Sequence, residues 1–237
     1  MRGSQVQMLE KLPISLSAQP DPREAVTCLS TGIEVLDTVL EGGLPRGKIS
    51  EIVGTPSSGR TGLILSILAQ AIAKEELVAY IDAFDSLDPS FAIKAGVKLK
   101  QLLWVRCGAS QQKAFKAADI LAPTGRFGVL VLDLTPIETP FKRVGGKRAP
   151  LSSWFRLQRS LQGTSTLLLV IGQASTAGSA AVVTVSLRRC KVQWCFASGE
   201  DSSPSLASLT PFFYGIWTEA QLLRGKHHGH VTFYSRF

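Results

Sequence analysis

Apolar residues between positions 33 and 173 fall into short continuous runs, and amphipathic segments separate these runs. Continuous apolar runs are typical of strands that are buried on both faces, whereas apolar residues recurring every three to four positions indicate helices. The pattern predicts helices at 33–40, 62–73, 87–96, 111–121 and 151–162, and strands at 48–53, 77–83, 102–107, 128–134 and 166–173. Helices between buried strands favour an α/β fold with a mainly parallel central sheet flanked by helices.

The pattern changes after about residue 180, where polar and apolar residues alternate and turn residues separate the segments. Alternation is typical of antiparallel strands with one solvated face. We expect strands at 181–194, 212–223 and 230–237, and we expect them to extend one edge of the parallel sheet as an antiparallel C-terminal extension. Residues 1–29 are interpreted as an N-terminal segment and linker, and residues 30–237 as a single domain.

Composition narrows the functional classes. The 237-residue chain is 45% apolar, which is enough for one sizeable core, and its longest apolar helix is too short to span a bilayer. With no apolar signal-peptide core at the N-terminus, we expect a soluble cytoplasmic protein without a membrane partner. A net charge of +8 favours a polyanionic partner such as nucleic acid, although many basic domains bind none.

Cysteine and histidine patterns do not favour a metal or redox site. The four cysteines form no C-x-x-C pair, and we interpret Cys28, Cys107, Cys190 and Cys195 as reduced structural thiols. The run "HHGH" at 227–230 has no carboxylate or thiol nearby in the sequence. Four-ligand metal coordination is therefore not expected there.

A glycine-rich turn follows the strand at 48–53. The segment "GTPSSGRT" matches the phosphate-loop pattern at Gly54, Gly59 and Thr61, with Ser58 inside it, but Arg60 stands where the pattern has lysine. Small residues at a strand-to-helix turn let backbone N–H groups converge on phosphate oxygens, and the threonine hydroxyl serves Mg²⁺. A planar guanidinium holds phosphate differently from an ammonium. The alternative interpretation is a glycine-rich turn that binds nothing.

Asp133 ends the apolar strand at 128–134, which is the position of the Mg²⁺-associated carboxylate in phosphate-loop folds. Thr61 and Asp133 are accordingly the residues expected to serve Mg²⁺ through a bound nucleotide. A carboxylate at the end of a buried strand also commonly caps the next turn, so this alternative stays open.

The runs "LSTGIEVLDTVLEGGLPRGKISEIVGTPSSGRTGLILSILAQAIA" and "AYIDAFDSLDPSFAIKAGVKLKQLLWVRC" together resemble the ATP-binding core of the bacterial RecA recombinase family. The resemblance implies a RecA-like phosphate-loop fold with ATP and Mg²⁺ as cofactors. It also implies that Gln173 senses the γ-phosphate and that Asp88 and Phe91 hold the adenine. A polar strand end, a helix N-cap and a core aromatic are the respective alternatives for these three residues.

The sequence also departs from the RecA pattern. Phe84 occupies the position of the glutamate that activates the attacking water, and the neighbouring Asp85 points elsewhere on a strand. Only "ASTAGSAA" stands where the family has a long DNA-lining loop. Neither the polymerisation helix nor the separate C-terminal domain is recognisable. These departures predict little or no ATP hydrolysis and argue against an ATP-driven strand-exchange filament.

A basic segment occupies the place of the family's first DNA-binding loop. It is "FKRVGGKRAP" at 141–150, and its cations are Lys142, Arg143, Lys147 and Arg148. Cations on a flexible loop suit phosphate contacts without sequence specificity, which predicts binding of single-stranded DNA. The alternative is a solvated surface loop.

Three functional hypotheses remain. A short, degenerate RecA-like chain resembles ImuA, the RecA-like subunit of the bacterial inducible mutagenesis cassette. That resemblance implies an accessory role in the SOS response and translesion DNA synthesis, with polymerase subunits as partners and self-association as a further option. The second hypothesis is an ATP-dependent, single-stranded-DNA-binding recombinase that acts in DNA repair. The third is a RecA-fold regulatory ATPase that acts on proteins.

Overall fold

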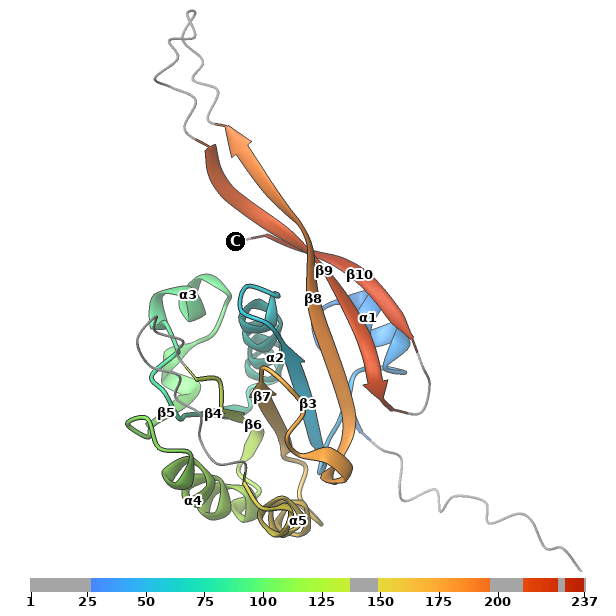
Figure 1. Cartoon of the computed structure of the whole chain (residues 1–237). Helices are drawn as coiled ribbons and strands as arrows, with labels where there is room; N and C mark the ends of the chain where they lie inside the picture. Colours follow the sequence, from blue (N-terminus) through green and yellow to red (C-terminus); the bar gives the residue numbers. More distant parts are fainter. Residues whose placement is uncertain (1–26, 137–148, 197–210, 226–228, 237) are drawn as a thin grey trace, which may run out of the picture.

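The computed structural model describes residues 27–136, 149–196, 211–225 and 229–236. Its main body is an eight-stranded sheet with the strand order β10-β9-β8-β3-β7-β6-β4-β5 (Figure 1). The strands of this sheet are β3 (Ile49–Gly54), β4 (Leu77–Asp82), β5 (Leu102–Arg106), β6 (Phe127–Asp133), β7 (Leu167–Gly172), β8 (Ala181–Phe196), β9 (Pro211–Arg224) and β10 (His230–Arg236). The α-helices are α1 (Glu34–Val39), α2 (Arg60–Ala73), α3 (Pro89–Lys94), α4 (Gln111–Leu121) and α5 (Leu151–Ser160).

The sheet has a parallel part and an antiparallel part. Strands β5, β4, β6, β7, β3 and β8 run parallel to their neighbours, whereas the pairs β8–β9 and β9–β10 are antiparallel. The predicted parallel sheet with an antiparallel C-terminal extension is confirmed. The structure places the boundary between the parallel and antiparallel parts at β8. This strand pairs in parallel with β3 on one side and in antiparallel orientation with β9 on the other.

Each face of the parallel part is covered by helices, as continuous apolar strands require. Within β6, Val129 and Val131 belong to the core cluster that contains α2, whereas Leu130 and Leu132 belong to the cluster that contains α4 and α5. Alternate side chains of one strand thus enter two different cores. Within the described residues, no helix is long and apolar enough to cross a membrane.

A small second sheet lies beside the main one and has no counterpart in the predicted elements. It pairs β1 (Cys28–Leu29) with β2 (Leu44–Pro45) in antiparallel orientation. The segment 41–47 between the predicted helix at 33–40 and the predicted strand at 48–53 therefore contains a short strand. Leu29 and Leu44 are both buried in the core cluster around α2. The domain boundary after residue 29 stays a prediction.

Candidate phosphate-binding site

The loop between β3 and α2 has a backbone that requires its two glycines. Gly59 has φ +93°, and a Cβ atom there would lie 2.6 Å from the Thr218 Oγ1 of β9. A Cβ atom on Gly54 would lie 2.4 Å from the Leu187 carbonyl oxygen of β8. Both distances are too short for a side chain, so the close approach of β8 and β9 to the loop depends on glycine.

The start of α2 offers polar groups that suit a phosphate. No side chain among the described residues caps this helix, so its first N–H groups are open to a ligand. Ser58 is buried, and its hydroxyl meets no hydrogen-bond partner among the described residues. Thr61 is exposed in the first helical turn. An anion at the positive end of the helix would satisfy these groups, so the loop fits a phosphate.

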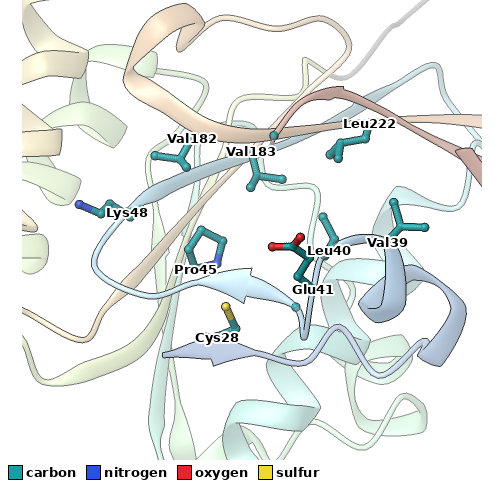
Figure 2. A pocket seen from close by; sticks show the side chains of 11 residues that line it. Cys28, Val39, Leu40, Glu41, Pro45, Lys48, Val182, Val183 and Leu222 are labelled. Carbon is teal, nitrogen blue, oxygen red and sulfur yellow. The ribbon is translucent and has the colours of Figure 1, made fainter. Parts of the chain in front are cut away.

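Two pockets, of about 390 Å³ and about 370 Å³, differ in the residues that line them. The smaller one, termed the loop pocket, is lined by Ser57, Ser58, Gly59, Arg60, Thr61 and Gly62 of the loop and by Arg189, Val192, Trp194 and Ile216 of β8 and β9. The larger one lies at the other end of β3, where Glu41 and Lys48 are the charged groups in a mainly aliphatic lining (Figure 2). Of these two pockets, the loop pocket is the one that contains the glycine loop and the start of α2.

The sequence did not predict that residues of β8 and β9 line the loop pocket. The Thr218 hydroxyl donates to the Ser58 carbonyl oxygen at 3.2 Å, which joins β9 directly to the loop. The only sequence signal was the alternating pattern of 181–194, which predicts that alternate side chains share a face but not what that face meets.

Arg60 turns its guanidinium toward the ends of β6 and β7. Its Nη1 donates to the Gly172 carbonyl oxygen at 2.6 Å and to the Thr135 hydroxyl at 3.3 Å. Burial lowers the pKa of Arg60, while the negative charge of Asp133 acts in the opposite direction. The cation that replaces the usual lysine is therefore already hydrogen-bonded inside the protein.

Asp133 is buried, and three hydrogen bonds hold its carboxylate. Oδ2 accepts from the Tyr80 and Ser86 hydroxyls, each at 2.6 Å, and Oδ1 accepts from the Thr135 backbone N–H at 2.8 Å. Burial, followed by the Asp133 charge, raises the pKa of Tyr80 well above its usual value, so Tyr80 stays a neutral donor. To bind a Mg²⁺ ion directly, Asp133 would have to share its oxygens with these donors. The loop thus fits a phosphate, and the metal-binding role of Asp133 stays a prediction.

The turn after β4 holds Ser86 against Asp133. Asp82, which is fully buried, accepts from the backbone N–H groups of Phe84, Ser86 and Leu87 and from Trp104 Nε1.

Phe84 is buried in the core cluster that contains α4 and α5. Asp85 forms an exposed ion pair with Arg106 at 2.9 Å. The position to which the resemblance assigns water activation therefore carries an apolar core residue, and its acidic neighbour Asp85 is paired with Arg106.

The residues expected to hold adenine do not line the loop pocket. Asp88 caps α3, and its Oδ1 accepts from the Ser90 N–H at 2.8 Å and the Phe91 N–H at 3.4 Å. Phe91 packs against the core cluster around α2. Gln173 follows the end of β7 and is half-buried. The ligand roles of these three residues stay predictions.

The short loop after Gln173 is fixed by a buried carboxylate that sequence reasoning also missed. Glu51, in the middle of β3, accepts from the Ser175 hydroxyl at 2.6 Å and from the Thr176 and Ala177 backbone N–H groups at 2.8 Å each. A glutamate inside a strand predicted to be buried was the available signal, because a buried charge needs partners. The basic residues Lys142, Arg143, Lys147 and Arg148 lie outside the described residues.

Comparisons with known proteins agree on one family. A family model described as the RecA N-terminal domain matches residues 12–208. "Protein RecA" of Rhizobium leguminosarum bv. viciae is 34% identical over 179 residues, which is 75% of this chain and 50% of that protein. "Protein RecA" of Gluconobacter oxydans is 42% identical over 126 residues, 53% of this chain and 36% of that protein.

A solved structure supports the fold alone. The RadB recombinase matches with a TM-score of 0.60 at 19% identity, and the match covers 88% of this chain and 95% of that one. Against the curated relatives the coverage is partial, since the chain spans about half of their length or less.

Proposed function

The chain belongs to the RecA family, and on that premise we propose that it is a RecA-like accessory protein of DNA damage tolerance. In this role it binds nucleoside triphosphate and single-stranded DNA but hydrolyses ATP negligibly. Translesion polymerase subunits are the proposed partners. The single observation that carries the proposal is the buried Asp133 carboxylate, held by three hydrogen bonds inside the protein, beside the internally bonded Arg60.

The proposed lack of turnover follows from what hydrolysis requires. A RecA-type reaction needs a group that positions or deprotonates water, contacts to the phosphates and a metal ion, all in one geometry. Phe84 supplies no base, and general-base assistance alone is typically worth about 10²–10⁴-fold in rate. Binding demands less, because the backbone N–H groups at the start of α2 and the Thr61 hydroxyl are sufficient to hold phosphates.

Steady-state phosphate release tests this proposal. The purified chain is assayed with ATP and Mg²⁺, with and without single-stranded DNA, beside an Asp133→Asn variant that preserves the size of the side chain. We expect turnover far below about one per second, which is the low end of ordinary enzymes. Turnover at or above that rate, lost in Asp133→Asn, would sink the proposal.

DNA binding is proposed for the basic segment at 142–148. Each cation that contacts a phosphate of single-stranded DNA contributes about 0.7 to the slope of log affinity against log salt. Replacing Lys142, Arg143, Lys147 and Arg148 by alanine should therefore lower that slope by about 3 and weaken binding of a labelled oligonucleotide equally for different sequences. A quadruple variant that binds as the parent does would leave this segment without a role in DNA binding.

An ATP-dependent recombinase is the second candidate, favoured by the names of the relatives, which include a RadB recombinase. The two candidates differ in ATP turnover and in strand exchange between homologous DNA molecules. An accessory protein is expected to do neither, and to be retained instead by immobilised translesion polymerase subunits. Sedimentation of the purified chain tests the proposed self-association.

A further inference from the structure

The glycine loop and the segment 172–177 leave neighbouring strands at the same edge of the sheet. Gly172, the last residue of β7, pairs with Val53 of β3, one position before the glycine loop begins at Gly54. Beyond Gly172 the segment is exposed at Ala174 and Ser175. A ligand held by the loop therefore lies beside this segment.

Both ends of the segment 172–177 are anchored to elements that flank the glycine loop. At its start, the Gly172 carbonyl oxygen accepts from Nη1 of Arg60, the first residue of α2, at 2.6 Å. At its end, the Thr176 and Ala177 N–H groups donate to the Glu51 carboxylate of β3. Because β3 enters the loop and α2 leaves it, a change at the loop can reach the segment through these contacts.

Arg60 has donors beyond the one that anchors the segment. Nη1 makes the bonds to Gly172 and Thr135, whereas Nε and Nη2 have no hydrogen-bond partner among the described residues. The Arg60 side chain also lines the loop pocket. A guanidinium presents several N–H donors in a rigid plane, so it can bond to acceptors on different sides at once. A lysine would offer a single nitrogen, for which the same acceptors would compete.

The Ser58 hydroxyl indicates that an anion binds on the same side of the loop. Ser58 lines the loop pocket, and its buried hydroxyl meets no hydrogen-bond partner among the described residues. An unsatisfied buried hydroxyl costs free energy, which a phosphate oxygen would recover by accepting from it. Ser58 and Arg60 thus present donors to one pocket.

We propose that Arg60 bridges a phosphate bound at the loop to the Gly172 carbonyl oxygen, and that phosphate binding thereby tightens the segment 172–177. The inference rests on the phosphate-binding part of the proposed function. Nη1 keeps its bond to Gly172, while Nε and Nη2 donate to the phosphate beside the N–H groups at the start of α2. The bridge uses the main chain of Gly172 and is independent of what the Gln173 side chain contacts.

The bridge predicts the direction of the effect. A phosphate that accepts from Nε and Nη2 fixes the plane of the guanidinium, and a fixed donor holds the Gly172 oxygen more persistently. By thermodynamic linkage, the tightened segment favours bound phosphate by the same factor, which is typically about 5- to 150-fold for coupled sites. Binding alone therefore changes the segment, and no hydrolysis is required.

Amide hydrogen exchange of the full chain tests the bridge, with inorganic tripolyphosphate as the probe. Calorimetric titration first establishes binding and the saturating concentration. At saturation, exchange within 173–177 should slow by at least about fivefold in the parent. Any ligand also suppresses global unfolding, so the loop at 108–110 after β5, four strands away from β3, serves as the internal control. Exchange there should slow less than about twofold.

Arg60→Lys separates phosphate binding from the bridge. The lysine keeps the positive charge at the loop, so this variant should still bind tripolyphosphate in the calorimeter. At saturation, however, exchange within 173–177 should slow less than about twofold, because one nitrogen does not serve both acceptors. The matched control is Arg189→Lys, the same change on the other side of the loop pocket, and it should keep the full slowing.

The possible contrary results are distinct. Unchanged or faster exchange in the saturated parent would overturn the inference, because the phosphate would then leave the segment unaffected or draw Arg60 away from Gly172. Equal slowing in Arg60→Lys would mean that the link does not run through Arg60. Loss of binding in Arg60→Lys would overturn the division of donors on which the bridge depends.

Failure of the bridge and failure of the proposed function can also be distinguished. A parent that binds no tripolyphosphate would remove the phosphate site, and the bridge would fall with it. A parent that shows the expected exchange pattern but also hydrolyses ATP in the phosphate-release assay would overturn the proposed function and leave the bridge intact.

Discussion

The loop after β3 and the loop after β7 leave the same edge of the parallel sheet, yet they use their backbone N–H groups in opposite ways. After β3, the N–H groups at the start of α2 have no side-chain cap among the described residues. After β7, the Thr176 and Ala177 N–H groups bind the buried Glu51 carboxylate. In the second loop, an internal acid occupies the place that a ligand anion would take.

The same contrast separates the phosphate loop from the carboxylates that flank it. The loop retains its glycines and an unsatisfied Ser58 hydroxyl, whereas donors from the protein bond to both oxygens of Asp82 and of Asp133. These bonds stabilise the folded chain and compete with a metal ion for the carboxylate oxygens. One edge of the sheet thus combines a region open to a ligand with a closed region, and each can be tested separately.

The largest effect is expected from breaking the closed region at Asp133. Asp133→Ala removes the acceptor of the Tyr80 and Ser86 hydroxyls and the negative charge near the buried Arg60. A loss of about 3–5 kcal/mol in the free energy of unfolding is expected, because three donors would lose a charged acceptor and a buried donor left unsatisfied costs about 1–3 kcal/mol. Urea denaturation measures it. Asp119→Ala, which breaks an exposed pair with Arg156, should cost at most about 1 kcal/mol, and comparable costs for both variants would refute the account.

Glu51→Ala should open the loop after β7. The Thr176 and Ala177 N–H groups would lose their acceptor while still partly buried, at an expected cost of about 2–3 kcal/mol. Hydrogen exchange of these two amides should accelerate more than that of Leu169 within β7. Glu51→Gln, which keeps an acceptor oxygen, should restore most of the protection. Unchanged exchange at Thr176 and Ala177 would show that Glu51 does not fix this loop.

Gly59→Ala tests the open region. Gly59 and Gly163 both have positive φ, but a Cβ atom on Gly163 meets no atom within 4 Å, whereas on Gly59 it would collide with Thr218. Gly163→Ala should lose about 1–2 kcal/mol of stability because alanine disfavours this backbone conformation, and Gly59→Ala should lose more because its Cβ atom also collides with Thr218. Only Gly59→Ala should also lose tripolyphosphate binding, measured by calorimetry. Retained binding in Gly59→Ala would mean that the loop geometry is not what holds the phosphates.

Elements with a clear period could be predicted from the sequence, and contacts between distant residues could not. The helix at 62–73 and the strand at 48–53 carry their hydrophobic pattern locally, and the structure has them as Arg60–Ala73 and Ile49–Gly54. Strands β1 and β2 have two residues each, which is too short for any period. The hydrophobic pattern therefore predicted the strands and helices of the main sheet but not the small sheet of β1 and β2.

The candidate site divides in the same way. The glycine loop has a local signature, and Asp88 carried a visible N-cap alternative because Pro89 and Ser90 follow it. The bonds of Asp133 could not be predicted, because Tyr80 and Ser86 lie 53 and 47 positions away in sequence and meet it only through the sheet order. The pocket face of β8 depends on where β9 crosses the loop. Sequence reasoning located the loop but not the residues opposite it.

The smallest effect, and the sharpest comparison, concerns neighbouring arginines on β8. Arg189 lines the loop pocket, whereas Arg188 points to the other face and forms an ion pair with Glu219. Arg189→Ala should weaken both ATP and tripolyphosphate about two- to fivefold, since an exposed charge pair is worth about 0.2–1 kcal/mol, and the loss should shrink as salt is raised. Arg188→Ala removes the same charge from the same strand and should change neither affinity. Because the two variants have equal net charge, a general electrostatic effect of the basic chain would weaken both alike. Equal losses would therefore show that Arg189 acts only through the overall charge, and that the open region ends at the loop itself.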